Sequence, residues 1–159
     1  MLYTLVILFV VAADQATKAL IMQSFAPYEV RSVIDGLFNL VYVTNTGAAF
    51  SFLADAGPWR HWFFVAVALL AIVGFTGGWW AWARDKRLLT VAMAMIVAGA
   101  IGNLIDRLRF GAVVDFLDVM LGSYHWPAFN VADSAICVGA GLYIVAAMLV
   151  ERPQKEGKI

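Results

Sequence analysis

Four long apolar runs, separated by shorter polar segments, dominate the chain. A helix needs about 20 apolar residues to cross the ~30 Å hydrocarbon core of a bilayer. The runs that reach this length cover residues 2–22, 61–82, 88–105 and 131–150. The second run has tryptophans at both ends, which is typical of side chains that settle at the two membrane interfaces. The pattern predicts an α-helical integral membrane protein with four transmembrane helices.

The composition supports this class and excludes others. Of the 159 residues, 63% are hydrophobic and 14% are charged, and the mean hydropathy is +0.82. We therefore expect a single membrane domain surrounded by lipid. The formal net charge is zero and no block of like charges occurs, so nucleic acid is not an expected partner. Cys137 is the only cysteine, which excludes an internal disulfide, and we expect it to be a small buried side chain.

The basic residues predict which side of the membrane each loop occupies. The short loop at residues 84–87 contains three basic residues, and the tail carries Arg152, Lys155 and Lys158. Because such residues favour the cytoplasmic side, we expect both termini there. The first run lacks a basic leader, and Asp14 and Lys18 interrupt it, so we interpret it as a permanent helix and not as a cleaved signal peptide.

The segment between the first two helices, residues 23–58, is too long for a tight turn. Residues 37–44 are rich in β-branched and aromatic side chains, which favours a strand. We expect a small periplasmic β-sheet here, with a turn at residues 45–47 and a return along residues 48–50, either as a second strand or into the membrane surface. A purely structural hairpin is an equally open interpretation. Residues 106–128 are expected to form a periplasmic loop.

Polar residues gather at one depth of the predicted bundle. On a helix that starts in the cytoplasm, Asp14 lies about 20 Å along the axis at ~1.5 Å per residue, with Lys18 one turn further out. The remaining polar residues of this layer are Asn103, Asp106, Arg107, Asp115, Asn130 and Asp133. A charged side chain exposed to lipid near mid-bilayer costs about 2.5–3.5 kcal/mol. Convergence of this kind predicts a functional site in the outer half.

Several of these residues also have a purely structural interpretation. Asp14 and Lys18 are four residues apart, so they share a helix face and can form an ion pair that only anchors the helix. Asn103 and Arg107 have the same spacing and can serve packing alone. We expect Asp106 to point away from that face.

The acids nearest the fourth helix have alternatives as well. Asp133 falls in the first turn, where an acid complements the helix dipole, and Asn130 is placed to cap the helix. Asp118 lies three residues from Asp115 and could replace it, although a solvated loop position is its simpler interpretation. Val113, Val114 and Phe116 would partly desolvate Asp115, which favours Asp115 over Asp118.

Two carboxylates can hydrolyse a peptide bond if Asp115 and Asp133 come within about 3 Å. At that distance they cannot both ionise, so they share a proton and titrate together. The ionised carboxylate can take a proton from an attacking water while the protonated one donates a hydrogen bond to the carbonyl oxygen. His61 and His125 have no partner at metal-ligand spacing, so we expect neither a metal nor another cofactor.

Two other classes remain open at this stage. Intramembrane acids can relay protons in a transporter or channel, although such acids are expected at several depths and these cluster at one face. Aspartates can also hold Mg²⁺ in a membrane transferase that acts on a phosphorylated lipid. Ion flux in liposomes and sensitivity to a chelator would separate these classes from a peptidase.

Five ordered blocks of the chain resemble bacterial lipoprotein signal peptidase, also called signal peptidase II. They read DQATK (14–18), NTGAAF (45–50), GAIGNLIDR (99–107), VDF (114–116) and FNVAD (129–133). Ala98 departs from the glycine that many relatives carry there. The resemblance implies an aspartic endopeptidase of the bacterial inner membrane, active near the periplasmic face and with its outer sheet lying on the membrane.

The resemblance also implies a substrate and a set of site residues. The substrate is a prolipoprotein, cut just before its diacylglyceryl-modified cysteine, and a cyclic peptide of the globomycin type is the implied inhibitor. Asp115 and Asp133 match the catalytic pair. The positions implied to shape the pocket or to contact substrate or inhibitor are Asp14, Lys18, Asn45, Gly47, Asn103, Arg107, Asn130 and Ala132. We expect the protein to be a monomer.

Overall fold

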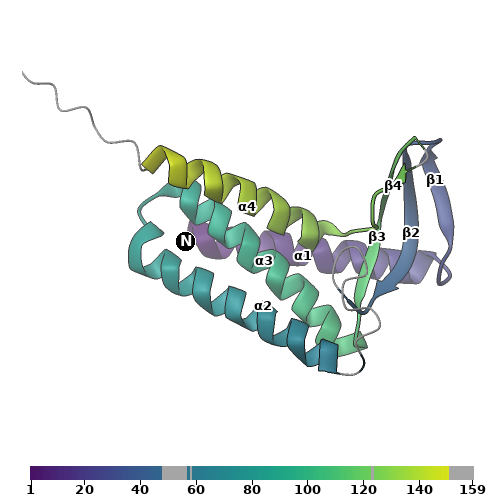
Figure 1. Ribbon diagram of the computed structural model, residues 1–159, viewed down its shortest axis with the longest axis horizontal. Coiled ribbons are helices and arrows are strands. Elements are labelled where there is room, and N and C mark those ends of the chain that lie inside the picture. Colours follow the sequence, from purple (N-terminus) through teal and green to yellow (C-terminus); the bar gives the residue numbers. More distant parts are fainter. Residues whose placement is uncertain (48–56, 58, 123, 151–159) are drawn as a thin grey trace, which may run out of the picture.

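The computed structural model describes residues 1–47, 57, 59–122 and 124–150 (Figure 1). The helices are α1 (Leu2–Ser24), α2 (Trp59–Gly78), α3 (Arg87–Phe110) and α4 (Val131–Val150), and α2 continues into a short π-helix, η2 (Trp79–Ala83). The strands are β1 (Val30–Ile34), β2 (Phe38–Asn45), β3 (Val113–Leu121) and β4 (Tyr124–His125). Among the residues that the structure describes, four helices are long and apolar enough to cross a membrane, which confirms the predicted four-helix class.

The central helix of the bundle is α3, which packs against α1, α2 and α4. Figure 1 shows it between α2 and α4, with α1 behind. Its buried side is rich in alanine and glycine, which lets neighbouring backbones approach closely. The start of α1 and the end of α4 lie at one end of the bundle, and the sheet lies at the opposite end.

Gly102 lies where α1, α3 and α4 meet. A Cβ atom at this position would lie 2.6 Å from Oδ2 of Asp14 and 3.1 Å from Cβ of Ala132. Because no side chain fits at such distances, glycine is required for the three helices to pack as they do.

A left-handed glycine ends α3 and returns the chain to the sheet. Gly111 has φ 73°, and its N–H donates to the carbonyl of Arg107 at 2.9 Å, as is common at helix C-termini. The segment at residues 106–128, which we expected to be a loop, therefore contains the last turn of α3 and the strands β3 and β4. Aspartate is disfavoured in strands, so Asp115 and Asp118 obscured the strand pattern of β3.

The sheet is antiparallel in the order β1-β2-β3-β4. Strand β2 confirms the strand predicted at residues 37–44, but its partner β3 comes from beyond α3. In the register of β2 and β3, Val43 pairs with Asp115 and Asn39 pairs with Asp118, with a bulge between Leu40 and Val43. The predicted return along residues 48–50 lies outside the described residues. The backbone N–H groups of Phe116 and Leu117 donate to the carbonyl of Phe129, which places Asp115 beside the start of α4.

Candidate active site

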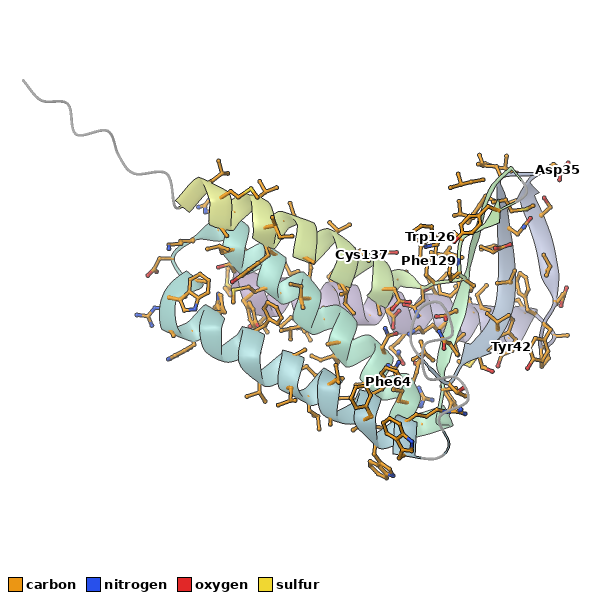
Figure 2. The ribbon with its side chains drawn as sticks, viewed as in Figure 1. Asp35, Tyr42, Phe64, Trp126, Phe129 and Cys137 are labelled. Atoms are coloured by element: carbon orange, nitrogen blue, oxygen red, sulfur yellow. The ribbon has the colours of Figure 1, made fainter. Side chains whose placement is uncertain are left out.

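Asp115 and Asp133 line one cavity of about 320 Å³ where the helices meet the sheet. Asp115 comes from β3 and Asp133 from the first turn of α4. The cavity is also lined by Asn45, Gly47, Asn103, Arg107, Val113, Trp126, Pro127, Ala128, Phe129 and Cys137. Figure 2 shows Trp126 and Phe129 beside the sheet-facing end of α4, with Cys137 further along that helix. The structure thus brings the two predicted acids to one site.

Asp115 is 2% exposed and is held by two side-chain amides. Nδ2 of Asn130 donates to its Oδ1 at 2.7 Å, and Nδ2 of Asn45 donates to its Oδ2 at 3.2 Å. Burial raises the pKa of Asp115 to about 7, and the negative charge of Asp133 adds to the effect. The two amides and the charge of Lys18 oppose this shift. Asp115 can therefore carry a proton near neutral pH.

Asp133 is oriented by residues of α3 and by the start of its own helix. Nδ2 of Asn103 donates to its Oδ1 at 2.7 Å, and its backbone N–H donates to Oδ1 of Asn130 at 2.9 Å. The second bond confirms that Asn130 caps α4. Nδ2 of Asn130 also donates to Oδ1 of Asn103 at 3.2 Å. A continuous hydrogen-bond path therefore joins Asp115 to Asp133 through two asparagines.

Asn45, Gly47 and Arg107 form another part of the cavity wall. The N–H of Gly47 donates to Oδ1 of Asn45 at 2.9 Å, which closes a local turn and agrees with the predicted turn at residues 45–47. Nη2 of Arg107 donates to the carbonyl of Gly47 at 3.2 Å, and the guanidinium lies 5.1 Å from the ring centre of Phe64. Arg107 thus ties α3 to the segment after β2 and places a positive charge at the cavity.

A buried ionic cluster lies behind the cavity wall. Nζ of Lys18 lies 2.9 Å from Oδ2 of Asp14 and 2.9 Å from Oδ2 of Asp106, and these side chains are no more than 1% exposed. The first contact confirms the predicted pair of Asp14 and Lys18. Lys18 also donates to Oδ1 of Asn103 at 3.2 Å. Asp106 belongs to the predicted polar layer but not to the residues implied by the resemblance, and Gln15, in the DQATK stretch, belongs to neither.

Asp118, Cys137 and Ala132 differ in how they lie relative to the cavity. Asp118 lies outside the cavity lining, and it accepts a hydrogen bond from Nδ2 of Asn39 at 2.8 Å within the sheet. Cys137 is exposed and lines the cavity, so the expectation of a buried side chain was wrong. Ala132 is fully buried, and its backbone N–H donates to Oδ1 of Asp14 at 2.9 Å. Within the described residues, no group of His, Cys, Asp and Glu side chains is arranged to hold a metal ion.

Fold and site together define a multi-pass membrane protein with a carboxylate-lined cavity at one end of a four-helix bundle. Comparison with known proteins narrows this class. The model of the family Signal peptidase (SPase) II matches residues 6–149.

Individual relatives agree with the family match. The chain is 48% identical over 151 residues to the lipoprotein signal peptidase of Geobacter sulfurreducens, covering 95% of this chain and 94% of that protein. It is 52% identical over 139 residues to that of Cupriavidus taiwanensis, covering 87% and 77%. A solved structure described as a bacterial membrane enzyme at 2.3 Å resolution matches with a TM-score of 0.88 and 31% identity, covering 99% of this chain and 93% of that one.

The chain belongs to the signal peptidase II family. It is therefore a peptidase of lipoprotein processing, held in a membrane by several helices. The resemblance carried by the five sequence blocks is confirmed.

Proposed function

We propose that the protein is an aspartic endopeptidase that removes the signal peptide from diacylglyceryl-modified prolipoproteins, cutting just before the lipidated cysteine. Asp115 and Asp133 are the catalytic residues and activate one water molecule. The observation that carries the proposal is the position of both carboxylates on one cavity, joined through Asn130 and Asn103. No metal or other cofactor is required by this chemistry.

In the first step, water attacks the carbonyl carbon of the scissile peptide bond. Ionised Asp133 takes a proton from the water, and protonated Asp115 gives its proton to the carbonyl oxygen, which yields a tetrahedral diol. The raised pKa of Asp115 favours this assignment of the shared proton. Asn130 and Asn103 hold the two carboxylates in place while the charge moves between them.

In the second step, the carbon–nitrogen bond breaks. Asp133 gives its proton to the leaving amine, and one hydroxyl of the diol returns a proton to Asp115 as the new carboxylic acid forms. The pair thus regains its starting state with Asp115 protonated and Asp133 ionised. The net reaction consumes one water and leaves no covalent enzyme intermediate.

An apolar groove beside the cavity is suited to the signal segment of the substrate. The groove has a volume of about 330 Å³, and it shares Asn103 and Arg107 with the catalytic cavity. Its other lining residues are apolar side chains of α2, α3 and α4: Phe64, Val67, Ala68, Ala71, Ile96, Ala100 and Ile136. A hydrophobic signal helix could lie here while the acyl chains of the lipidated cysteine remain in the bilayer.

The proposal also includes the orientation of the chain in the membrane, the residues that contact the substrate and the oligomeric state. The basic loop at residues 84–87 and the basic tail favour the cytoplasmic side for both ends of the chain. The cavity, at the other end of the bundle, then opens near the periplasmic face of the bacterial inner membrane. Asn45, Gly47 and Arg107 contact the substrate or a globomycin-type cyclic peptide, because they line the cavity. The protein acts as a monomer.

The test is cleavage of a purified, diacylated precursor by the purified protein, with and without a chelator. Mass determination of the fragments should place the cut before the lipidated cysteine, at a rate that the chelator does not change. The same precursor without its diacylglyceryl group serves as the matched control and should be cut far more slowly. A cut at another position, or loss of activity with the chelator, would contradict the proposal.

A further inference from the structure

We propose that Lys18, Asp14 and Asp106 form a positioning unit that fixes the two catalytic aspartates through the backbone just before each of them. The inference rests on the proposed function of Asp115 and Asp133. None of the three residues lines the catalytic cavity, so their effect on the reaction passes through other residues. The inference is based on two backbone hydrogen bonds, one at the residue before Asp115 and one at the residue before Asp133.

The first contact holds the start of α4. Oδ1 of Asp14, in α1, accepts a hydrogen bond at 2.9 Å from the backbone N–H of Ala132. Ala132 directly precedes Asp133, and the first N–H groups of a helix have no partner within the helix. Asp14 therefore fixes the first turn of α4, and with it the Cα atom from which the Asp133 side chain projects.

The second contact holds the start of β3 in the same way. Oδ2 of Asp106, in α3, accepts a hydrogen bond at 3.1 Å from the backbone N–H of Val114. Val114 directly precedes Asp115 and is 2% exposed. Each catalytic aspartate thus follows a residue whose backbone N–H donates to a buried carboxylate of a different secondary-structure element.

Lys18 links these two carboxylates. Its ammonium group has three N–H donors, and it lies 2.9 Å from Asp14, 2.9 Å from Asp106 and 3.2 Å from Oδ1 of Asn103. Asn103 in turn donates to Asp133. One side chain of α1 is therefore connected to the backbone before Asp115, to the backbone before Asp133 and to the carboxylate of Asp133 itself.

Gln15 contacts both carboxylates of the positioning unit. Its Nε2 lies 3.0 Å from Oδ1 of Asp106 and 3.2 Å from Oδ2 of Asp14. It also donates to the carbonyl of Gly102 at 3.3 Å. The two carboxylates are therefore joined both by Lys18 and by Gln15, and each is fixed in orientation as well as in position.

Positioning explains this arrangement better than stability does. Burying charges is costly, and replacing a buried ion pair with apolar side chains is often neutral or stabilising. Here one ammonium group contacts two carboxyl groups, so the cluster is not a simple one-to-one ion pair. Reaction rates, in contrast, depend steeply on geometry, and a misplacement of about 1 Å can cost on the order of 100-fold. Polar groups that hold catalytic side chains in place serve this need.

The test compares kcat and KM for a diacylated precursor in wild type, Asp106→Asn and Gln15→Ala. Asp106→Asn keeps the shape of the side chain, but only one of its two terminal atoms can accept, so Lys18, Gln15 and Val114 cannot all be satisfied. We expect kcat to fall about 10- to 100-fold with KM within about twofold. Gln15 is only partly buried, so Gln15→Ala should fold, and its kcat should fall about three- to tenfold.

Thr90→Val is the matched control for a general effect on folding. Thr90 is also in α3, is 4% exposed, and makes hydrogen bonds to Trp79 and to the carbonyl of Ala83 at the other end of the bundle. Its substitution should lower thermal stability without changing kcat. Unchanged kcat in both Asp106→Asn and Gln15→Ala, an effect on KM alone, or an equal fall in Thr90→Val would overturn the inference.

The same experiment separates this inference from the function on which it rests. If wild type does not cleave the precursor, the proposed function fails and the inference fails with it. If wild type cleaves and the two variants match it, the inference alone fails.

Discussion

Nδ2 of Asn130 lies 2.7 Å from Oδ1 of Asp115, so an asparagine that caps α4 also holds an aspartate of β3. The same side chain therefore sets where the fourth helix begins and how the carboxylate on the neighbouring strand is turned. Asn130 is fully buried, so removing its side chain takes both contacts from partners inside the protein. One side chain thus couples the start of a helix to the orientation of a site carboxylate.

Asn130→Ala should reduce kcat about 10- to 100-fold, because a hydrogen bond to a charged group contributes about 1.5–3 kcal/mol. Loss of the cap should also lower the free energy of unfolding by about 1 kcal/mol. Steady-state cleavage and denaturant unfolding in detergent would measure the two effects. Ser134→Ala is a suitable control, since it removes a neighbouring hydroxyl that donates to the carbonyl of Asn130 at 2.9 Å and does not contact Asp115 within the described residues. Equal rates for Asn130→Ala and wild type would show that Asn130 does not orient Asp115.

Activity should decline as the pH rises through about 7. The mechanism needs one proton on the pair, and Asp115, whose pKa is raised to about 7 by burial, loses its proton in this range. Above that point kcat/KM should fall about tenfold per pH unit. Asp118→Asn, which alters a carboxylate outside the cavity lining, should keep the same midpoint. A profile that stays flat up to about pH 9 would argue against a shared proton.

The stability of the protein should also depend on Asp115. Its pKa is 3.8 without the protein environment and about 7 in the folded state, so the folded state binds the proton more tightly. The resulting stabilisation is complete below about pH 4 and is lost as the pH rises through about 7, a change of roughly 4 kcal/mol. Asp115→Asn lacks this titration.

Thermal unfolding at pH 5 and pH 8 would reveal the effect as a difference between two proteins. Groups far from Asp115 titrate equally in both, so the stability of wild type relative to Asp115→Asn should fall between these two pH values. A relative stability that is the same at both would contradict the raised pKa.

Gly102→Ala should impair both packing and catalysis. The added Cβ would lie 2.6 Å from Oδ2 of Asp14, so Asp14 must move and its bond to the N–H of Ala132 must change. We expect a loss of about 1–3 kcal/mol in stability and at least a tenfold loss in kcat. Gly77→Ala is the matched control, because nothing lies within 4 Å of a Cβ there, and it should be neutral or slightly stabilising. Full activity in Gly102→Ala would show that the position of Asp14 is not critical.

The transmembrane helices and the contacts within one helix could be predicted from the sequence, because both depend on local patterns. Transmembrane helices depend on long apolar runs, and local pairs such as Asp14 with Lys18, or the cap of Asn130 on α4, depend on spacing along one helix. These signals are local, so the sequence displays them directly.

The features that were missed depend on contacts between distant segments. Strand β3 was hidden because its aspartates resemble loop residues, although their carboxylates are satisfied by Asn130 in one case and by Asn39 in the other. The role of Asp106 depends on the turn at Gly111, which brings the N–H of Val114 back to the helix that has just ended. Neither hydrophobic periodicity nor motif spacing reports such a contact.

If Asp115 and Asp133 perform the cleavage together, loss of either carboxylate should abolish the chemical step. Single-turnover cleavage of a diacylated precursor should be compared in wild type, Asp115→Asn and Asp133→Asn, with thermal unfolding to show that all three are folded. Each variant should bind the precursor and cut it at least about 10³-fold more slowly than wild type. Cleavage by either folded variant within about tenfold of the wild-type rate would contradict the account.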